Sequence, residues 1–232
     1  MQIRQLTREQ QHYLQLMGIT VWLDRGRQPE ERKLPVTAPG NTVVEVMPDW
    51  AALQKQVAAC TRCDLHRSRT QTVFGAGDPA ADWLLIGEAP GAEEDRQGEP
   101  FVGRAGKLLN AMLAAIDLDR EHVYIANILK CRPPNNRDPG PDEVKECEPY
   151  LKQQIAMIQP KIILALGRVA AQNLLRIEVP IGRMRGKRYD YADTGIPVVV
   201  SYHPAYLLRS PREKRKSWQD LQLAMKTYKE NK

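Results

Sequence analysis

The stretch WLLIGEAPG, residues 83–91, decides the fold of this chain, because an apolar run passes directly into a glycine, an acidic residue and a proline. Three further apolar runs follow: VYIANILK (123–130), KIILALG (161–167) and PVVVSYHP (197–204). Strands without polar alternation are buried on both faces, and strands joined by helices pair in parallel. The sequence therefore predicts an α/β fold, a three-layer α/β/α sandwich with a central, mainly parallel four-stranded sheet.

Helical stretches separate and follow these runs. The expected helices cover residues 104–116, 142–158, 168–175 and about 217–230. Asp49 is the expected N-cap of an earlier helix that ends at about Ala59. We therefore expect one domain over residues 49–232.

Residues 1–48 form an extension and a linker in this interpretation. Residues 7–25 predict a short helix that is broken at Gly18 and followed by an apolar tail, and the polar, proline-bearing stretch 26–48 predicts the linker. The start, MQIRQLTREQQ, lacks the apolar core of a signal peptide, and no run approaches the length of a membrane span. We expect a soluble, cytoplasmic monomer with no membrane association.

The amino-acid composition and net charge are consistent with one sizeable domain that binds a polyanion. The chain has 232 residues, of which 42% are hydrophobic, and a formal net charge of +6. The first 50 residues carry six basic and six acidic side chains, so the whole excess of positive charge falls on the remainder. A moderately basic globular body is compatible with nucleic acid.

Polar side chains stand where three of the four predicted strands end. Glu88 follows the first strand, Asn127 closes the second, and His203 follows the fourth, where Pro204 restrains its backbone to an extended conformation. Ligands bind at the carboxyl ends of the strands of open parallel sheets, so we expect these three side chains to converge. The structural alternative for Asn127 is to cap the next turn, and a lone histidine is usually structural or exposed.

Two loops near this edge add candidate ligand contacts. In GEAPGAEED (87–95), the glycines let the backbone of residues such as Gly87 and Ala89 approach a ligand closely; the alternative is an ordinary turn between strand and helix. In PFVGRAG (100–106), Phe101 lies between two glycine-containing turns and is a candidate for stacking on a base. The alternative for Phe101 is a place in the core.

Basic residues gather in two segments expected near the same edge, GRMRGKR (182–188) and SYHPAYLLRSPREKRK (201–216). They predict contacts to a phosphate backbone, with Arg185 and Arg209 as candidates, unless they are solvated surface. Leu207 and Leu208 then resemble a wedge inserted between base steps.

Four cysteines, Cys60, Cys63, Cys131 and Cys147, leave three interpretations open. Two disulfides are disfavoured without an export signal, and a redox C-x2-C pair leaves the other two cysteines unexplained. A four-thiolate site uses all of them. The wide separation of the second pair favours an iron–sulfur cluster over zinc, which prefers two C-x2-C knuckles. The three interpretations that stay open are therefore an iron–sulfur cluster, a zinc site, and core cysteines that bind no metal.

The combination of GEAPG, PFVGRAGKLL, Asn127 before KCRPP, four cysteines and HPAYLL resembles a family 4 uracil-DNA glycosylase, the iron–sulfur type, over roughly residues 50–230. The resemblance implies a uracil-DNA glycosylase-like fold, a [4Fe-4S] cluster and removal of uracil from DNA in base excision repair. It implies that the cluster ligands are Cys60, Cys63, Cys131 and Cys147. It also implies a uracil pocket of Glu88, Phe101, Asn127 and His203 with the backbone of the GEAPG loop, in which Glu88 and His203 are catalytic.

Residues 14–25, LQLMGITVWLDR, are similar to the amino-terminal peptide of the psi subunit of the bacterial replicative clamp loader, at Leu16, Gly18, Ile19, Thr20 and Trp22. This resemblance implies clamp-loader subunits as partners, whereas a short apolar segment more often packs on its own domain. Two other functions compete with excision: a module that binds uracil or single-stranded DNA with little turnover, and a zinc protein with an unrelated substrate.

Overall fold

The computed structural model describes Gly18 and residues 48–231. The helix expected over residues 7–25, nearly all of the linker and the peptide that resembles the clamp-loader subunit lie outside the described residues. Gly18 itself is exposed and lies in a turn.

A six-stranded sheet forms the centre of the domain, in the order β1-β3-β2-β4-β6-β5. Four parallel strands make up its middle, as the apolar runs predict: β2 (Trp83–Gly87), β3 (Tyr124–Asn127), β4 (Ile162–Leu166) and β6 (Ile196–Ser201). The sheet has two further short strands at its edges that the sequence did not predict, β1 (Ala76–Gly77) and β5 (Arg188–Tyr191), which pair antiparallel with β3 and β6. Neither edge strand carries an apolar run, because each lies at the border of the sheet rather than between two layers of helices.

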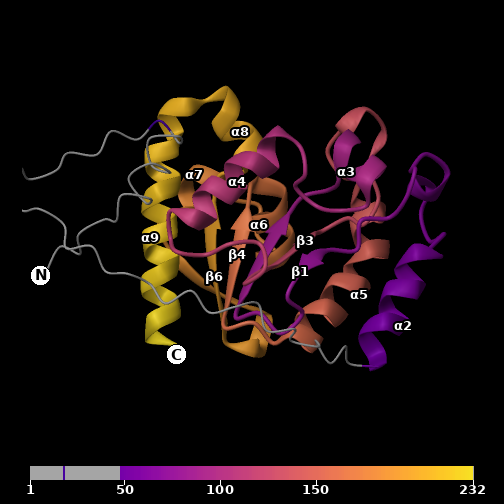
Figure 1. Ribbon diagram of the computed structural model, residues 1–232, viewed down its shortest axis with the longest axis horizontal. Helices are drawn as coiled ribbons and strands as arrows, with labels where there is room; N and C mark the ends of the chain where they lie inside the picture. Colours follow the sequence, from indigo (N-terminus) through magenta and orange to yellow (C-terminus); the bar gives the residue numbers. More distant parts are fainter. Residues whose placement is uncertain (1–17, 19–47, 232) are drawn as a thin grey trace, which may run out of the picture.

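Helices fill the connections between the strands (Figure 1). The α-helices are α2 (Pro48–Ala58), α3 (Ala92–Gln97), α4 (Arg104–Ala114), α5 (Pro141–Ile158), α6 (Arg168–Leu175), α7 (Ile181–Met184), α8 (Pro204–Arg209) and α9 (Lys214–Glu230). Single 3-10 turns are η1 (Asp64–Arg67), η2 (Pro134–Asn136), η3 (Ala192–Thr194) and η4 (Pro211–Glu213). Within the described part of the chain, none of the helices combines the length and apolarity needed to cross a membrane.

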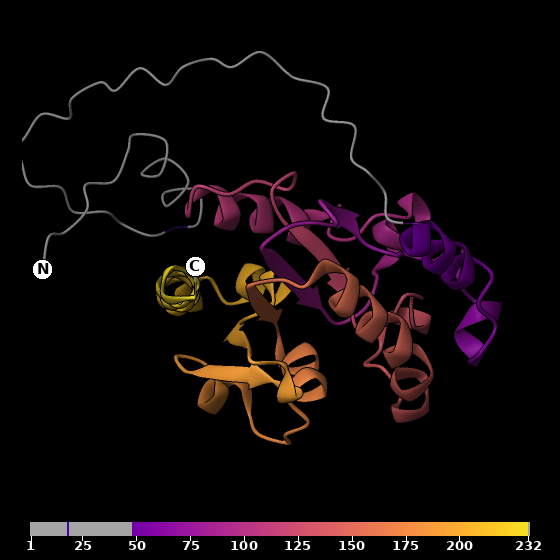
Figure 2. The same ribbon diagram turned by 90° about the horizontal axis from the view of Figure 1, so that it is seen from below.

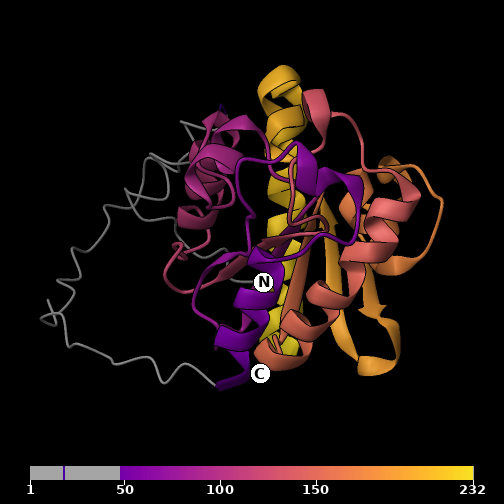
Figure 3. The ribbon, with the colours of Figure 1, turned by 90° about the vertical axis from the view of Figure 1, so that its right-hand side faces the viewer.

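The two faces of the sheet bury separate apolar cores, which gives the three predicted layers. One core joins alternate strand residues such as Leu84 and Ile163 to α2, α5 and α6, and the other joins Leu85 and Leu164 to α4, α8 and α9. Seen from below, α4 and α9 lie on the opposite side of the sheet from α5 (Figure 2), and α2 lies in front of the sheet in the side view (Figure 3). The neighbouring residues of each strand thus serve opposite cores, which explains the absence of polar alternation.

The carboxyl ends of the parallel strands meet at one edge, where α3 follows β2 and α8 follows β6 (Figure 1). From β2 the chain moves to β3 on one side and then to β4 on the other, so the strand order reverses around β2. Such a reversal opens a crevice outside the strand ends. Gly87 and Asn127 are register partners at this point.

Candidate active site and cysteine pocket

A pocket of about 420 Å³ opens at the carboxyl ends of the strands. The residues that the sequence argument placed at this edge line it together: Glu88, Ala89, Phe101, Asn127 and His203. Their side chains come from three strands and one loop that are far apart in the chain. We call this cavity the strand-end pocket.

Asn127 presents an unpaired acceptor to the strand-end pocket. The residue is 2% exposed, and among the described residues its Oδ1 has no hydrogen-bond partner. Buried polar groups without a partner cost free energy, so an unpaired carboxamide oxygen at a pocket is a group prepared for a ligand. Gly87 does not line the pocket; a Cβ there would collide with Asn127 Oδ1 and lie 2.7 Å from the Phe101 ring. Gly87 therefore makes room for both side chains.

Phe101 closes one wall of the strand-end pocket. It is 6% exposed and its ring stacks on that of His203, with centroids 5.3 Å apart and planes 29° apart. Its backbone has a φ of +55°, in the left-handed region that residues with side chains rarely adopt. The loop 100–103 holds the ring in place at the expense of local backbone strain.

His203 is a neutral hydrogen-bond donor in this structure. It is the N-cap of α8, and its Nδ1 accepts the N–H of Ala205 at 3.1 Å. Burial, with a smaller effect of Arg209, lowers the pKa of His203 to about 4. An imidazole whose Nδ1 accepts a hydrogen bond and which is uncharged at neutral pH carries its proton on Nε2. The structure thus supplies an Nε2–H donor without a positive charge.

Glu88 is a carboxyl group with a weakened tendency to ionise. Burial raises its pKa above the ordinary value, Asp138 raises it further, and Arg168 opposes both. Arg168 pairs with Asp138 at 2.6 Å, so the two neighbouring charges largely offset one another. Burial in the pocket is therefore the main cause of the shift.

Glu94 is a pocket residue that the sequence reasoning missed. Its Oε2 accepts the Gly91 N–H at 3.2 Å, and its Oε1 accepts those of Val102 and Gly103 at 3.0 and 3.2 Å. One carboxylate thus ties the loop after β2 to the loop before α4. The signal was present, because a glutamate three residues after the N-cap of a helix has the spacing of a capping box.

Two of the expected DNA contacts are wrong. Leu207 is 1% exposed and packs in the core shared by α4, α8 and α9, because the turn of α8 that exposes Leu208 directs Leu207 inward. Arg185 forms a buried ion pair with Asp220 at 2.7 Å and lies 4.4 Å from the ring centre of Tyr202. An inward guanidinium that is already paired is not available to a phosphate.

The two remaining candidates are compatible with a DNA surface. Leu208 is partly exposed at the end of α8, and Arg209 lines the strand-end pocket. Both therefore stay predictions.

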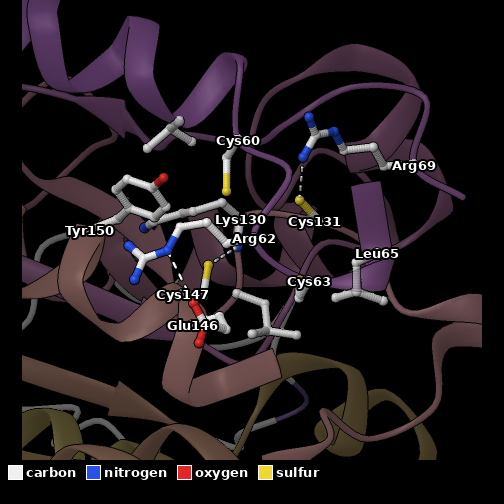
Figure 4. Close-up of a pocket in the computed structure, with 12 residues that line it drawn as sticks. Cys60, Arg62, Cys63, Leu65, Arg69, Lys130, Cys131, Glu146, Cys147 and Tyr150 are labelled. Atoms are coloured by element: carbon white, nitrogen blue, oxygen red, sulfur yellow. Dashed lines mark hydrogen bonds and ion pairs between the residues drawn. The ribbon is translucent and has the colours of Figure 1, made fainter. Parts of the chain in front are cut away.

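The four cysteines line a second, separate pocket, the cysteine pocket (Figure 4). All four are free thiols rather than disulfides. Cys60 and Cys63 follow the end of α2, Cys131 follows β3, and Cys147 lies in α5. Figure 4 shows the sulfur atoms of Cys60, Cys131 and Cys147 directed into the space between them.

The cysteine pocket has the donors that a cluster of thiolates requires. Arg69 Nη1 donates to the sulfur of Cys131 at 3.0 Å, and the backbone N–H of Lys130 donates to that of Cys147 at 3.2 Å. Burial raises the pKa of the Cys147 thiol to about 11, so a positive partner is needed to hold this sulfur as a thiolate at neutral pH.

The described residues do not bring the four sulfurs to one point. Within residues 48–231 no three His, Cys, Asp or Glu side chains lie close enough to hold one metal ion. Thiolates are ligands of both zinc and iron–sulfur clusters, and all four cysteines line the same pocket.

Lys130 lies between the two pockets. It is 1% exposed, and its Nζ donates to the backbone carbonyl of Asn127 at 3.0 Å and to Oε1 of Gln154 at 2.6 Å. The same residue gives its backbone N–H to Cys147. One buried side chain therefore connects the residue at the end of β3 with the segment that carries the cysteines.

Comparisons with known proteins agree with this geometry. A family model described as the uracil DNA glycosylase superfamily matches residues 74–222. The chain is 50% identical over 164 residues to a type-4 uracil-DNA glycosylase of Archaeoglobus fulgidus, an alignment that covers 68% of this chain and 82% of that protein. Type-4 uracil-DNA glycosylases of Sulfurisphaera tokodaii and Thermotoga maritima are 45% and 44% identical, each over 68% of this chain and over 76% and 82% of their own lengths.

The matched region contains most of both apolar cores, the strand-end pocket and two of the four cysteines. The resemblance suggested by the sequence motifs thus extends over most of the domain. The chain belongs to the uracil DNA glycosylase superfamily, and within it to the type-4 uracil-DNA glycosylases.

Proposed function

We propose that this protein is a uracil-DNA glycosylase, a hydrolase that flips uracil out of DNA and cleaves its N-glycosidic bond to leave an abasic site in base excision repair. The observation that carries the proposal is the buried, unpaired Oδ1 of Asn127 at the wall of the strand-end pocket. Family membership and the identities to type-4 uracil-DNA glycosylases support it.

Recognition begins with extrusion of the nucleotide, because a base inside a duplex is out of reach. In the proposed complex, Phe101 stacks on the extruded ring. Asn127 accepts the N3–H of uracil through Oδ1 and donates to O4 through its amide. Cytosine presents an amine at C4 and a bare N3, so its binding leaves buried groups mispaired.

Cleavage breaks the C1′–N1 bond, and its electron pair leaves with uracil as an anion delocalised over O2 and O4. The neutral His203 donates Nε2–H toward O2, where charge develops in the transition state. An ionised Glu88 stabilises the cationic sugar and orients the water that adds to C1′. The water adds its oxygen to C1′ and loses one proton to Glu88 or solvent, and the uracil anion takes up one proton on N1, so the products are a C1′ hydroxyl and neutral uracil.

Contacts to DNA outside the base come from the same edge. We propose that Leu208 fills the space left by the extruded nucleotide and that Arg209 binds the adjacent phosphate.

We also propose that Cys60, Cys63, Cys131 and Cys147 hold a [4Fe-4S] cluster. The shared pocket and the N–H donors to two of the sulfurs support this assignment. When bound, the cluster would cross-link three chain segments. It would thereby hold the end of α2 against α5 and the loop after β3, while the chemistry takes place in the strand-end pocket.

Three further expectations belong to the proposal: a cytoplasmic location, a monomeric state, and binding of residues 14–25 to clamp-loader subunits. Sedimentation of the purified protein tests the second. A synthetic peptide of residues 1–28 tests the third, and lack of binding to isolated clamp-loader subunits would remove it.

Asn127→Asp tests the function at its central residue. The variant keeps an acceptor for N3–H but replaces the donor to O4 with a repelling oxygen, so we expect single-turnover excision of uracil to fall by at least about 10²-fold. The carboxylate accepts from the amine of cytosine, so the ratio of uracil to cytosine excision should also fall. The measurement is alkali cleavage of labelled oligonucleotides after incubation with the protein.

Asn173→Asp is the matched control, because Asn173 lies in α6 and donates to the Val169 carbonyl away from the strand-end pocket. It should excise uracil at the wild-type rate. Unchanged rate and selectivity in Asn127→Asp would contradict the pairing scheme. A wild-type protein that binds uracil-containing DNA without cleaving it would instead be the binding module.

A further inference from the structure

Phe101 keeps a backbone conformation that a bulky residue avoids. Its φ of +55° is one of the positive φ values found outside glycine in the described residues. Such strain persists only where surrounding groups hold the segment, and it concentrates at ligand sites. The groups that hold Phe101 therefore determine where its ring stands in the strand-end pocket.

Arg120 provides one such hold from outside the pocket. It lies in the loop between α4 and β3, and its guanidinium donates from Nη2 to the Pro100 carbonyl at 2.7 Å and from Nη1 to the Phe101 carbonyl at 3.2 Å. Nη1 also lies 3.4 Å from Oδ1 of Asn110 on α4. A planar, rigid fork that binds two successive carbonyls fixes the relative orientation of the two peptide units on either side of the Phe101 Cα.

The opposite side of the same loop is held by Glu94, which accepts the N–H groups of Val102 and Gly103. The first turn of α4 is shaped around the loop, since a Cβ at Gly106 would overlap the Phe101 carbonyl. One cation thus holds two carbonyls and one anion holds two N–H groups, with Phe101 between them. Glu94 lines the strand-end pocket, whereas Arg120 does not.

We propose that Arg120 is a positioning residue for base recognition, which holds the Pro100 and Phe101 carbonyls so that the Phe101 ring stands ready to stack on the extruded base. This inference rests on the proposed function. Without Arg120, the strained backbone of Phe101 relaxes and the ring leaves its place beside His203. Arg120 is not a catalytic residue, because its effect passes through Phe101.

The test is Arg120→Met in the full chain. We expect the inhibition constant of free uracil to rise about tenfold, a loss within the range that one stacked base contributes, with a matching fall in kcat/KM on a single-stranded uracil oligonucleotide. Affinity for the same oligonucleotide without uracil should stay within about twofold, because phosphate contacts are untouched. Lys107→Met removes a positive charge from the same outer surface as Arg120 and should leave all three values unchanged.

A double-mutant cycle separates positioning from general damage. If Arg120 acts through the Phe101 ring, Arg120→Met has no further effect on uracil inhibition once Phe101→Ala is present. Arg120→Lys keeps the charge but loses the planar fork. Its inhibition constant for free uracil should lie between those of the wild type and Arg120→Met, and it can replace Arg120→Met in the same double-mutant cycle.

Two results would overturn the inference. One is uracil inhibition by Arg120→Met within about twofold of wild type; the other is an effect of equal size with and without the Phe101 ring. A wild-type protein that releases no uracil at all would refute the proposed function instead, so the two failures are distinguishable.

Discussion

The strand-end pocket contains the last residue of β3 and the cysteine pocket contains the residues that follow β3, but the two pockets are built in opposite ways. Asn127 ends β3 with an unpaired oxygen in a cavity of about 420 Å³, whereas Cys131, four residues later, has its sulfur held by Arg69. A buried polar atom without a protein partner is available to bind a ligand, whereas a buried polar atom with fixed partners stabilises the fold. This difference supports substrate binding and cleavage in the strand-end pocket and a role in stabilising the fold for the cysteine pocket.

Lys130 limits how independent the two pockets are. Its Nζ holds the Asn127 carbonyl, and its backbone N–H holds Cys147. A disturbance at the cysteines therefore reaches Asn127 through one buried residue. The comparison predicts large effects on excision from the strand-end pocket and small, indirect effects from the cysteine pocket.

The largest effect is expected from His203→Ala. Loss of one donor to a developing anion typically costs about 10²–10³ in rate, so single-turnover excision should fall by that factor. His122→Ala is the control, because His122 is an exposed histidine that pairs with Asp119 at 2.7 Å outside both pockets. A near-normal rate for His203→Ala would show that this residue takes no part in the chemistry and would contradict the role assigned to the strand-end pocket.

A smaller effect, with a distinct pH dependence, is expected from Glu88→Gln. Burial raises the pKa of Glu88, so in the wild type the ionised form is lost, and excision falls, as the pH drops through a value above the ordinary carboxyl range. The variant should lose about tenfold in rate at pH 8. It should also lack the acidic limb of the rate profile measured from pH 4 to pH 8. An unchanged acidic limb would show that another group controls it.

The smallest effect on excision is expected from Cys147→Ser. This variant tests whether the cysteine pocket contributes to stability rather than to the chemistry. The purified variant should lack the absorbance at about 400 nm that an iron–sulfur cluster gives. Loss of a cross-link of this kind should lower the unfolding temperature by about 5–15 °C. Excision per folded molecule at 25 °C should stay within about threefold of wild type, because the changed sulfur lies outside the strand-end pocket.

A loss of rate in Cys147→Ser as large as that of His203→Ala would contradict the division of roles. Zinc in the purified wild-type protein, in place of iron and sulfide, would contradict the cluster.

The central strands and the strand-end pocket could be predicted from sequence, because each buried strand is an apolar run and three of the four are closed or followed by a polar residue. The edge strands could not: β1 has two residues, and β5 has four, of which only Tyr189 and Tyr191 face the core. Their pairing depends on the neighbouring strand rather than on their own pattern.

Pairs of side chains that are far apart in the chain could not be predicted from the sequence either. Arg185 is paired by Asp220, and the sequence offers no sign of which carboxylate a surface-like arginine will meet. Leu207 and Leu208 are equally apolar, and only the orientation of the short helix α8 decides which of them is buried. Arg120 has no motif at all, since its partners are backbone carbonyls.

A crystal structure of the wild-type protein with free uracil would show the recognition step itself. We expect the base in the strand-end pocket, stacked on Phe101, with N3–H on Asn127 Oδ1 and O2 within hydrogen-bond distance of His203 Nε2. Uracil bound elsewhere, or bound in this pocket with the Asn127 oxygen still unpaired, would contradict this expectation.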